Sequence, residues 1–398
     1  MKNIAIISEY NPFHKGHLYQ INEIKKIYSN SRIISIMSGN FVQRGEPAIL
    51  NKYERCKNAI LSGVDLVLQI PTIYSLQSAE NFALGSIKIL RELKIIDFLS
   101  FGIESSDFNS LYKIAEVQYK NEKVLREEIS IIMNKGFSFP KAFEMATNKF
   151  LDLDIKDCFL SNNILALEYI KSTFKTKYNL NFLPILRQGS NHLVDKVEKN
   201  KQPSASAIRE SIYNDKLDTI SNYLPDSSFQ SLKGLGKKPD YYDLIKYVFL
   251  IENMDFTTIT GYEEGIDNLI LKNLKISKSY DEFLEKSKSK RYKESRLKRY
   301  LLNCLLHVTK NFVDESIDKR PTFVNILGFN ERGLSIIKEI SQYSNIELIV
   351  NKRDFKLTDA NSIELFKLEE KATDLYNIIS KELKSEYQYM PVIKKEDS

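Results

Sequence analysis

The turn that organises this chain reads Glu9-Tyr10-Asn11-Pro12-Phe13-His14-Lys15-Gly16-His17. It follows the apolar run from Ile4 to Ile7, which predicts a first strand, and it opens a segment from His17 to Tyr28 whose apolar residues recur at helical spacing. The quoted residues therefore form a strand-to-helix turn. The N-terminus of a helix offers unpaired N–H groups and a partial positive charge to an anion. Gly16 has no Cβ, so a ligand can approach the backbone closely there.

The same alternation of strand and helix continues to about residue 213. The expected strands are 32–37, 65–70, 97–101 (closed by Gly102) and 181–186, and the expected helices are 51–62, 75–93 and 204–213. Apolar strands that alternate with helices predict an α/β fold, with a Rossmann-like parallel sheet covered on both faces. Ligands bind such sheets beyond the carboxyl ends of the strands, where the quoted turn lies.

His14 and His17 are three residues apart, so they share one face of the first helical turn. An isolated pair of this kind is more often two surface or capping histidines. The placement directly after the first strand, behind Asn11-Pro12-Phe13, favours an anion site instead.

Composition limits the setting of the chain. Its 398 residues predict two or three domains, with 42% hydrophobic and 28% charged residues as in a soluble protein. No apolar run reaches the roughly 18 residues of a membrane span, and no signal peptide is evident. Cys56, Cys158 and Cys304 form no CxxC pair, which favours a reduced compartment and a cytoplasmic location without membrane contact.

The expected domains are 1–224, a helical and basic region 225–310, and a small C-terminal α/β unit 311–398. In the last unit we expect strand 322–327, helix 331–343, strand 346–350 and a helix near 362–380, followed by a loose tail from Met390. Gly328 to Gly333 lacks the Lys-Ser/Thr pair of a P-loop. His192 and His307 are interpreted as structural, so no metal site is predicted.

A second phosphate signature is Ser204-Ala205-Ser206-Ala207-Ile208-Arg209, at the start of a later helix. Alone it would be an N-cap serine and a surface arginine. After an HxGH turn it resembles the second signature of the HxGH nucleotidylyltransferase superfamily, which predicts an ATP site. Ala205 departs from the hydroxyl residue common in small adenylyltransferases, so one phosphate contact is in doubt.

Longer matches narrow the resemblance to the bacterial tRNA(Met) cytidine acetate ligases. They are residues 8–17, Met37-Ser38-Gly39-Asn40-Phe41-Val42-Gln43-Arg44-Gly45-Glu46-Pro47-Ala48, and weaker motifs at 101–102, 161–165, 187, 204–209, 290–292 and 327–330. The resemblance covers nearly the whole chain. It implies that ATP and acetate give acetyl-adenylate and pyrophosphate, and that the acetyl group passes to N4 of the wobble cytidine of elongator tRNA(Met).

The resemblance also implies the nucleotide contacts. They are Ile7, Ser8, Glu9, Tyr10, Asn11, Pro12, Phe13, His14, Lys15, Gly16, His17, Leu18, Tyr19, Gln20, Gly102, Asn162 and Arg187, with Asn163 as the alternative to Asn162.

Attack of acetate on the α-phosphorus needs positioning and charge stabilisation rather than a protein nucleophile. His14 and His17 are expected to donate to α- and β-phosphate oxygens, and Arg209, Ser204 and Ser206 to hold pyrophosphate. A Mg²⁺ ion bridging phosphates is expected as well, but it needs few protein ligands and none is named.

Two further segments keep two interpretations each. Gln43 to Pro47 either binds the acceptor and closes over the site, or is a surface turn with an Arg/Glu ion pair. The basic residues of 286–299 either bind RNA phosphates or form a solvated helix face. They are Lys286, Lys288, Lys290, Arg291, Lys293, Arg296, Lys298 and Arg299.

Three functions compete: the tRNA acetate ligase, an adenylyltransferase for a small metabolite phosphate, and a non-catalytic nucleotide- or RNA-binding protein. The roughly 190 residues beyond the second signature disfavour the metabolite enzyme, and the two phosphate signatures disfavour the binding protein. No stable protein partner is inferred.

Overall fold

The computed structural model describes residues 1–104, 107–151, 160–187, 203–236, 238–289, 291–353 and 359–395. Cys158, His192 and Lys290 lie outside them. The strands are β1 (Lys2–Ser8), β2 (Ser31–Ser38), β3 (Phe41–Val42), β4 (Glu46–Pro47), β5 (Leu66–Ile70), β6 (Phe98–Ile103), β7 (Asn181–Leu186), β8 (Phe323–Asn330), β9 (Glu347–Ile349) and β10 (Val392–Lys394). The helices before the second phosphate signature are α1 (Lys15–Ile27), α2 (Lys52–Leu61), α3 (Thr72–Ser75), α4 (Ala79–Leu93), α5 (Phe108–Lys120), α6 (Glu122–Asn134), α7 (Phe139–Thr147) and α8 (Ser161–Thr176). Those from this signature onward are α9 (Ala205–Tyr213), α10 (Asp226–Leu232), α11 (Tyr242–Leu250), α12 (Ile266–Leu274), α13 (Tyr280–Ser287), α14 (Glu294–Leu306), α15 (Lys310–Asp318), α16 (Glu331–Tyr343) and α17 (Ala360–Ser380).

Within the described residues, one sheet organises the molecule in the order β10-β8-β5-β2-β1-β6-β7, with β9 paired to β8. Its strands pair in parallel except at the β5–β8 junction, which is antiparallel. From β1 the chain winds outward through β2 and β5, then crosses to β6 and β7 on the other side. The switch point between β1 and β6 is where doubly wound sheets bind ligands, beyond the strand ends. The predicted α/β Rossmann-like parallel sheet is confirmed.

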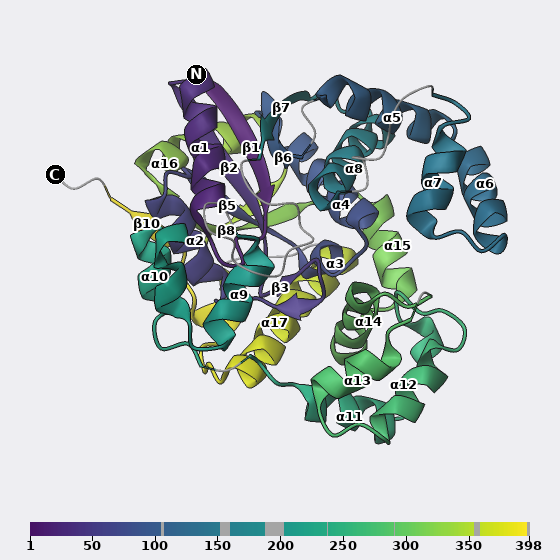
Figure 1. Ribbon diagram of the computed structural model, residues 1–398. Helices are drawn as coiled ribbons and strands as arrows, with labels where there is room; N and C mark the ends of the chain where they lie inside the picture. Colours follow the sequence, from purple (N-terminus) through teal and green to yellow (C-terminus); the bar gives the residue numbers. More distant parts are fainter. Residues whose placement is uncertain are drawn as a thin grey trace.

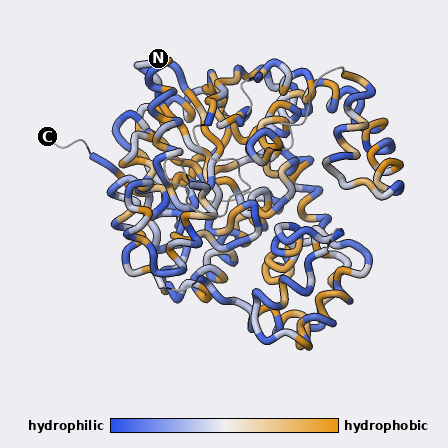
Figure 2. Tube along the Cα trace, viewed as in Figure 1, coloured by the Kyte–Doolittle hydropathy of each residue, from blue (hydrophilic) through white to orange (hydrophobic). Residues whose placement is uncertain are grey.

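Successive side chains along a strand point to opposite faces of the sheet, and they contribute to a separate hydrophobic core on each face. In β1, Ile4 and Ile6 belong to a cluster with α1 and α2, whereas Ala5 faces the opposite cluster with α4 and α8. Figure 1 shows these helices on the two sides of the sheet. The hydrophobic residues, orange in Figure 2, run through the centre of the molecule along the strands. Burial on both faces explains why these strands are continuous apolar runs in the sequence.

In Figure 1 the helices α11 to α14 form a lobe below the sheet, and the helices α5 to α7 project to the upper right, beyond α4 and α8. The lobe is not isolated, because Leu297 and Tyr300 of α14 belong to the same buried cluster as the α4 face of the sheet. Asn303 of α14 also donates to the carbonyl of Leu76 at 3.3 Å. The lobe is thus packed onto the face of the sheet that α4 covers.

The C-terminal residues extend the main sheet rather than building a second one. β8 pairs with β5, and Asn330 at the end of β8 donates its backbone N–H to the carbonyl of Asp65 at 3.0 Å. The division into domains at residues 224 and 310 stays a prediction, but its last boundary is crossed by a continuous sheet.

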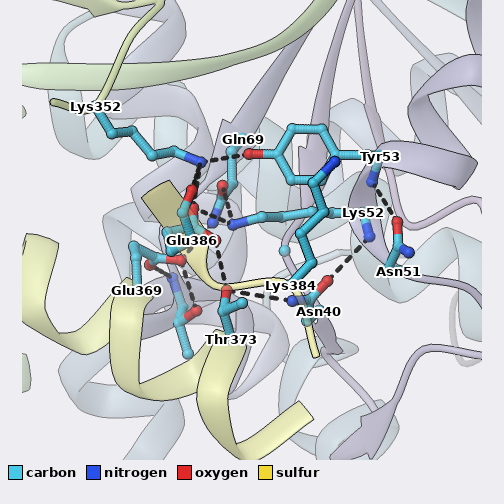
Figure 3. Close-up of polar contacts among 12 residues, drawn as sticks. Asn40, Asn51, Lys52, Tyr53, Gln69, Lys352, Glu369, Thr373, Lys384 and Glu386 are labelled. Atoms are coloured by element: carbon cyan, nitrogen blue, oxygen red, sulfur yellow. Dashed lines mark hydrogen bonds and ion pairs between the residues drawn. The ribbon is translucent and has the colours of Figure 1, made fainter. Parts of the chain in front are cut away.

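A buried polar network anchors the C-terminal residues further. Lys52 of α2 and Lys352 both form ion pairs with Glu386, and all three are nearly inaccessible to solvent. Figure 3 shows Glu369 and Thr373 of α17 beside them. Glu369 accepts from Gln69 of β5 and from Thr72, while Thr373 donates to Glu386. Segments some 300 residues apart are therefore joined by buried charge.

Some expected boundaries were wrong. The helix expected over 75–93 is broken, because the Ser78 hydroxyl accepts from the N–H of Asn81 and starts α4 anew after the short α3. The strand expected to close at Gly102 runs on to Ile103. The tail expected to be loose contains β10, which pairs in parallel with β8.

Candidate active site

A pocket opens at the switch point of the sheet, where the carboxyl ends of β1, β6 and β7 meet the start of α1. Its lining residues are Ile6, Ile7, Ser8, Glu9, Tyr10, Asn11, His14, Gly16, His17, Tyr19, Gln20, Gln43, Arg44, Phe82, Phe101, Gly102, Asn162, Leu165, Tyr169, Ile185, Arg187, Ser204, Ala205, Ser206 and Arg209. The two phosphate signatures, almost 190 residues apart in sequence, thus line the same pocket.

The two histidines cap α1 with their own rings. Nδ1 of His14 accepts the N–H of Gly16 at 3.0 Å, and Nδ1 of His17 accepts the N–H of His14 at 3.2 Å. The rings stack with centroids 3.8 Å apart. Since each Nδ1 is an acceptor, a neutral ring carries its proton on Nε2. Each histidine thus keeps an Nε2–H donor for a ligand.

Burial and neighbouring charge keep these rings neutral. Desolvation, with the nearby guanidinium groups of Arg187 and Arg209, lowers the pKa of His14 to about 3. Desolvation, His14 and Arg187 lower the pKa of His17 well below its ordinary value. At neutral pH the pair therefore acts as two neutral hydrogen-bond donors, and the positive charge of the pocket comes from arginines.

Arg209 and Ser206 reach the pocket from α9, which begins where the Ser204 hydroxyl accepts the N–H of Ala207 at 3.1 Å. Arg209 is almost fully buried and donates to the carbonyl of Asn11 at 2.8 Å. Its other terminal nitrogen lies 3.4 Å from the Ser206 hydroxyl. This arginine is therefore held against the HxGH turn, with cationic atoms at the pocket.

The predicted contacts from the opposite wall also converge. Arg187, just after β7, donates to Oδ1 of Asn162 at 3.3 Å. Its aliphatic carbons lie over Gly102, where a Cβ would come within 3.1 Å of them. Asn163 lies outside the lining, fully buried, with its Oδ1 accepting the N–H of Glu104 at 2.9 Å. The geometry thus favours Asn162 over Asn163.

Four residues of the predicted contact segment do not line the pocket. Phe13 is buried in the core beneath α1, and Leu18 packs against that core. Lys15 is exposed, and Pro12 follows a cis peptide bond within the turn. These residues shape or support the turn, while the rest of the segment faces the pocket.

The apolar wall of the pocket was not among the predicted site residues, although Phe101 and Leu165 lie within the motifs that carry the resemblance. Phe82, Phe101, Leu165, Tyr169 and Ile185 belong to it. A helical stripe could have found part of this wall, because Asn162, Leu165 and Tyr169 are spaced i, i+3 and i+7 on α8. Phe82 and Ile185 carry no such signal, since core residues have the same pattern.

The segment Gln43 to Pro47 comprises the turn of the β3–β4 hairpin and β4 itself, and it lies between the pocket and α14. Arg44 donates to the Ser206 hydroxyl at 3.0 Å on the pocket side. Glu46 accepts Arg209 at 3.3 Å and Lys298 of α14 at 2.8 Å. Burial would raise the pKa of Glu46, but these cations outweigh it and lower that pKa. The interpretation as a simple surface turn is therefore wrong.

Only part of the basic segment faces solvent. Lys298 and Arg299 point inward, Lys298 to Glu46 and Arg299 to the carbonyl of Gln43 at 3.2 Å. Arg291 and Arg296 are more exposed and share Glu263. Lys286 pairs with Glu282, and Lys288 with Glu285, both acidic residues of α13. RNA contact by this segment stays a prediction for its outward residues alone.

Two kinds of feature were searched for in the described parts of the chain, clusters of metal-ligating side chains and membrane-spanning helices. No group of three or more histidine, cysteine, aspartate or glutamate side chains is arranged there to hold a metal ion. No described helix has both the length and the apolar character needed to cross a bilayer.

Comparison with known proteins connects this geometry to a family. The model of the family HIGH Nucleotidyl Transferase matches residues 1–390. A Clostridium perfringens protein named tRNA(Met) cytidine acetate ligase is 38% identical over 99% of this chain and 100% of its own length. A Thermoanaerobacter protein of the same name is 36% identical over 95% of each chain.

Solved structures agree over the whole fold. The apo crystal structure of Thermotoga maritima TmcAL has a TM-score of 0.91 at 29% identity and covers 99% of this chain and 100% of that one. The crystal structure of the same protein bound with α-thio ATP has a TM-score of 0.87 at the same coverage.

Proposed function

The chain belongs to the tRNA(Met) cytidine acetate ligase family of HIGH nucleotidyl transferases, and we propose that it activates acetate as acetyl-adenylate and transfers the acetyl group to N4 of the wobble cytidine of elongator tRNA(Met). The observation that carries this proposal is the convergence of the HxGH histidines, Arg187 and the SASAIR helix on one pocket.

The first step would be an in-line attack of an acetate oxygen on the α-phosphorus of ATP. A bond forms between that oxygen and the α-phosphorus, and the bond to the β-phosphate bridging oxygen breaks. The Nε2–H donors of His14 and His17 would stabilise the negative charge on the phosphate oxygens as it builds up. Arg209 and Ser206 would hold the departing pyrophosphate, as a planar guanidinium can contact two oxygens at once.

The nucleotide contacts are proposed from the same geometry. Gly102, Asn162 and Arg187 would hold the nucleoside end against the apolar wall, and the HxGH turn would hold the phosphates. Ser204 would act mainly through the helix, because its hydroxyl already caps α9. A Mg²⁺ ion, where one takes part, would be held chiefly by phosphates and water.

The second step would transfer the acetyl group to tRNA. The acceptor would approach along the β3–β4 hairpin, because this hairpin lies between the pocket and the basic residues of 286–299 and contacts both. The outward residues Arg291, Lys293 and Arg296 would contact the phosphate backbone.

The test is to incubate the protein with ATP, acetate and elongator tRNA(Met) and to analyse the digested nucleosides by mass spectrometry. We expect N4-acetylcytidine only when all three are present. A protein that is folded and binds ATP but forms no N4-acetylcytidine would contradict the proposal. Transfer of AMP to a metabolite phosphate instead would support the alternative adenylyltransferase.

A further inference from the structure

We infer that Glu9 is the general base of the transfer step and takes the proton from the exocyclic amine that attacks the acetyl carbonyl. This inference rests on the proposed function, because it assigns a role within its second reaction. Glu9 is the only carboxylate among the described residues that line the pocket.

The position of Glu9 is fixed by the surrounding backbone. It directly follows β1, and its Oε1 accepts the backbone N–H of Gln43 at 2.7 Å. Its own carbonyl accepts from the buried Arg55 of α2. The side chain is half-buried at the pocket wall. The carboxylate thus stands between the HxGH turn and the hairpin that packs on α14, on the side from which the acceptor is proposed to enter.

A carboxylate is a poor partner for the phosphates of ATP, because two negative charges in a partly desolvated pocket repel. The group it would favour is a hydrogen-bond donor. The N4 amine of cytidine is such a donor, and it is a weak nucleophile because its lone pair is conjugated with the ring. Loss of its proton during attack removes the positive charge that would otherwise develop on nitrogen.

The histidines, the arginines and Tyr169 of the pocket do not suit this role. His14 and His17 already use Nδ1 to accept backbone N–H groups, so their remaining ring nitrogen carries a proton and donates. Tyr169 is buried, and this burial raises the pKa of its phenol far above neutral pH. The guanidinium groups cannot accept a proton.

The environment of Glu9 balances two effects. Burial raises the pKa of Glu9 above its ordinary value of 4.5, while the N–H of Gln43 and three cations lower it. The charged groups that face it are Arg44 of the hairpin, Arg209 of α9 and Arg55 of α2, and Tyr169 of α8 is the nearby phenol. A carboxylate with a raised pKa is a stronger base than one in water.

Acetyl transfer from the adenylate to N4 needs no reacting group other than these. The N4 nitrogen forms a bond to the acetyl carbon, and the bond between that carbon and the AMP phosphate oxygen breaks. AMP leaves with the electron pair. One N4 proton passes to the carboxylate of Glu9, which later releases it to water.

The test uses Glu9→Gln, because glutamine can still accept the N–H of Gln43. Acetyl-adenylate is first formed on the enzyme, tRNA is then added, and a single turnover of acetyl transfer is followed. We expect the transfer rate to fall ~10²–10⁴-fold, with a much smaller change in acetate-dependent ATP–pyrophosphate exchange. The acid limb of the pH–rate profile for transfer should disappear in Glu9→Gln and persist, at a lower rate, in Glu9→Asp.

Glu92→Gln is the matched control, because Glu92 is a buried glutamate that pairs with Arg320 and lies outside the pocket lining. It should leave transfer and its pH profile unchanged. Equal transfer rates in Glu9→Gln and the parent, or a loss confined to ATP affinity, would overturn the assignment and make Glu9 a nucleotide contact. Absence of N4-acetylcytidine in the parent protein would instead overturn the proposed function.

Discussion

At the scale of single residues, the histidine pair joins a structural role to the chemical one that we propose for it. Each ring uses one nitrogen to close the first turn of α1, and this contact fixes which nitrogen carries the proton. The donor nitrogens are therefore set before any ligand binds, so no reorganisation is needed as charge develops. The turn is also held by Arg209, which binds the carbonyl of Asn11 at 2.8 Å.

His17→Ala should lower acetate-dependent ATP–pyrophosphate exchange by ~10²–10³-fold, because one charge-stabilising donor is removed. It also removes the acceptor for the N–H of His14, so a modest loss of thermal stability is expected. The control is His307→Asn, since His307 lies outside the pocket with a φ of 55°, which asparagine tolerates. Exchange near the parent rate in His17→Ala would contradict the assignment of the HxGH turn.

The sequence was most informative at this scale where a residue type has a specific geometric use. His14, His17 and Arg209 were predicted as site residues, and the structure places them in one pocket. The choice between Asn162 and Asn163 could not be made from spacing, since both begin the same helix. It depends on which side chain turns toward Arg187 and which toward the backbone of Glu104.

At the scale of elements, the β3–β4 hairpin connects the pocket to α14. Its strands have two residues each, too short for any periodic pattern, so only the glycine and proline of a turn could be recognised in the sequence. Longer elements such as α2 and β2 were predicted well because several buried side chains repeat along them. The addition of β8 beside β5 was not predictable, because it depends on contacts between residues over 250 positions apart.

Gly45→Ala should destabilise the protein and lower acetyl transfer, because this hairpin position combines two constraints. Its φ is +81°, and a Cβ there would lie 2.5 Å from the backbone nitrogen of Arg299. The positive φ alone costs about 1–2 kcal/mol, and the close approach to α14 adds to it. Urea unfolding and single-turnover transfer measure the two effects.

Gly234→Ala is the matched control, with a φ of +74° and no atom within 4 Å of the added Cβ. It should lower the free energy of unfolding through the positive φ alone, without decreasing the rate of acetyl transfer. Equal effects of the two substitutions would show that the packing of the hairpin on α14 has no role.

At the scale of the whole molecule, buried charge fastens the C-terminal residues to the N-terminal sheet. Glu386→Gln should lower the free energy of unfolding by about 3–5 kcal/mol, because Lys52 and Lys352 would lose their shared carboxylate. Glu364→Gln, which breaks an exposed pair with Lys367, should cost far less because water screens that pair. Urea unfolding curves of both variants, compared with the parent, measure the difference.

The free energy of unfolding should also depend on pH through Glu386. Burial would raise the pKa of Glu386, but Lys52 and Lys352 outweigh it and lower that pKa in the folded state. The unfolded chain therefore binds this proton at higher pH, so the stabilisation is complete above pH about 4.5 and is lost as pH falls through the lowered value. Stability in Glu386→Gln should decline less over this acid range, and an unchanged decline would contradict the assigned pairing.

RNA binding would also involve surfaces far from the pocket, because a tRNA must extend beyond it. Neutralising Arg291, Lys293 and Arg296 together should weaken tRNA binding and flatten its salt dependence by ~0.7–0.9 log unit for each phosphate that is no longer neutralised. ATP–pyrophosphate exchange should stay at the parent rate. An unchanged salt slope would assign these residues to a solvated helix face, where Glu263 already pairs with two of them.

We propose that acetate attacks the α-phosphorus in this pocket and that the acetyl group then leaves AMP for tRNA. The most direct measurement supplies acetate labelled with ¹⁸O in both oxygens, together with ATP and elongator tRNA(Met), and follows the label by mass spectrometry. We expect one ¹⁸O in the phosphate of the released AMP and one in the acetyl group of N4-acetylcytidine. Formation of ADP and labelled inorganic phosphate, with no label in AMP, would contradict it.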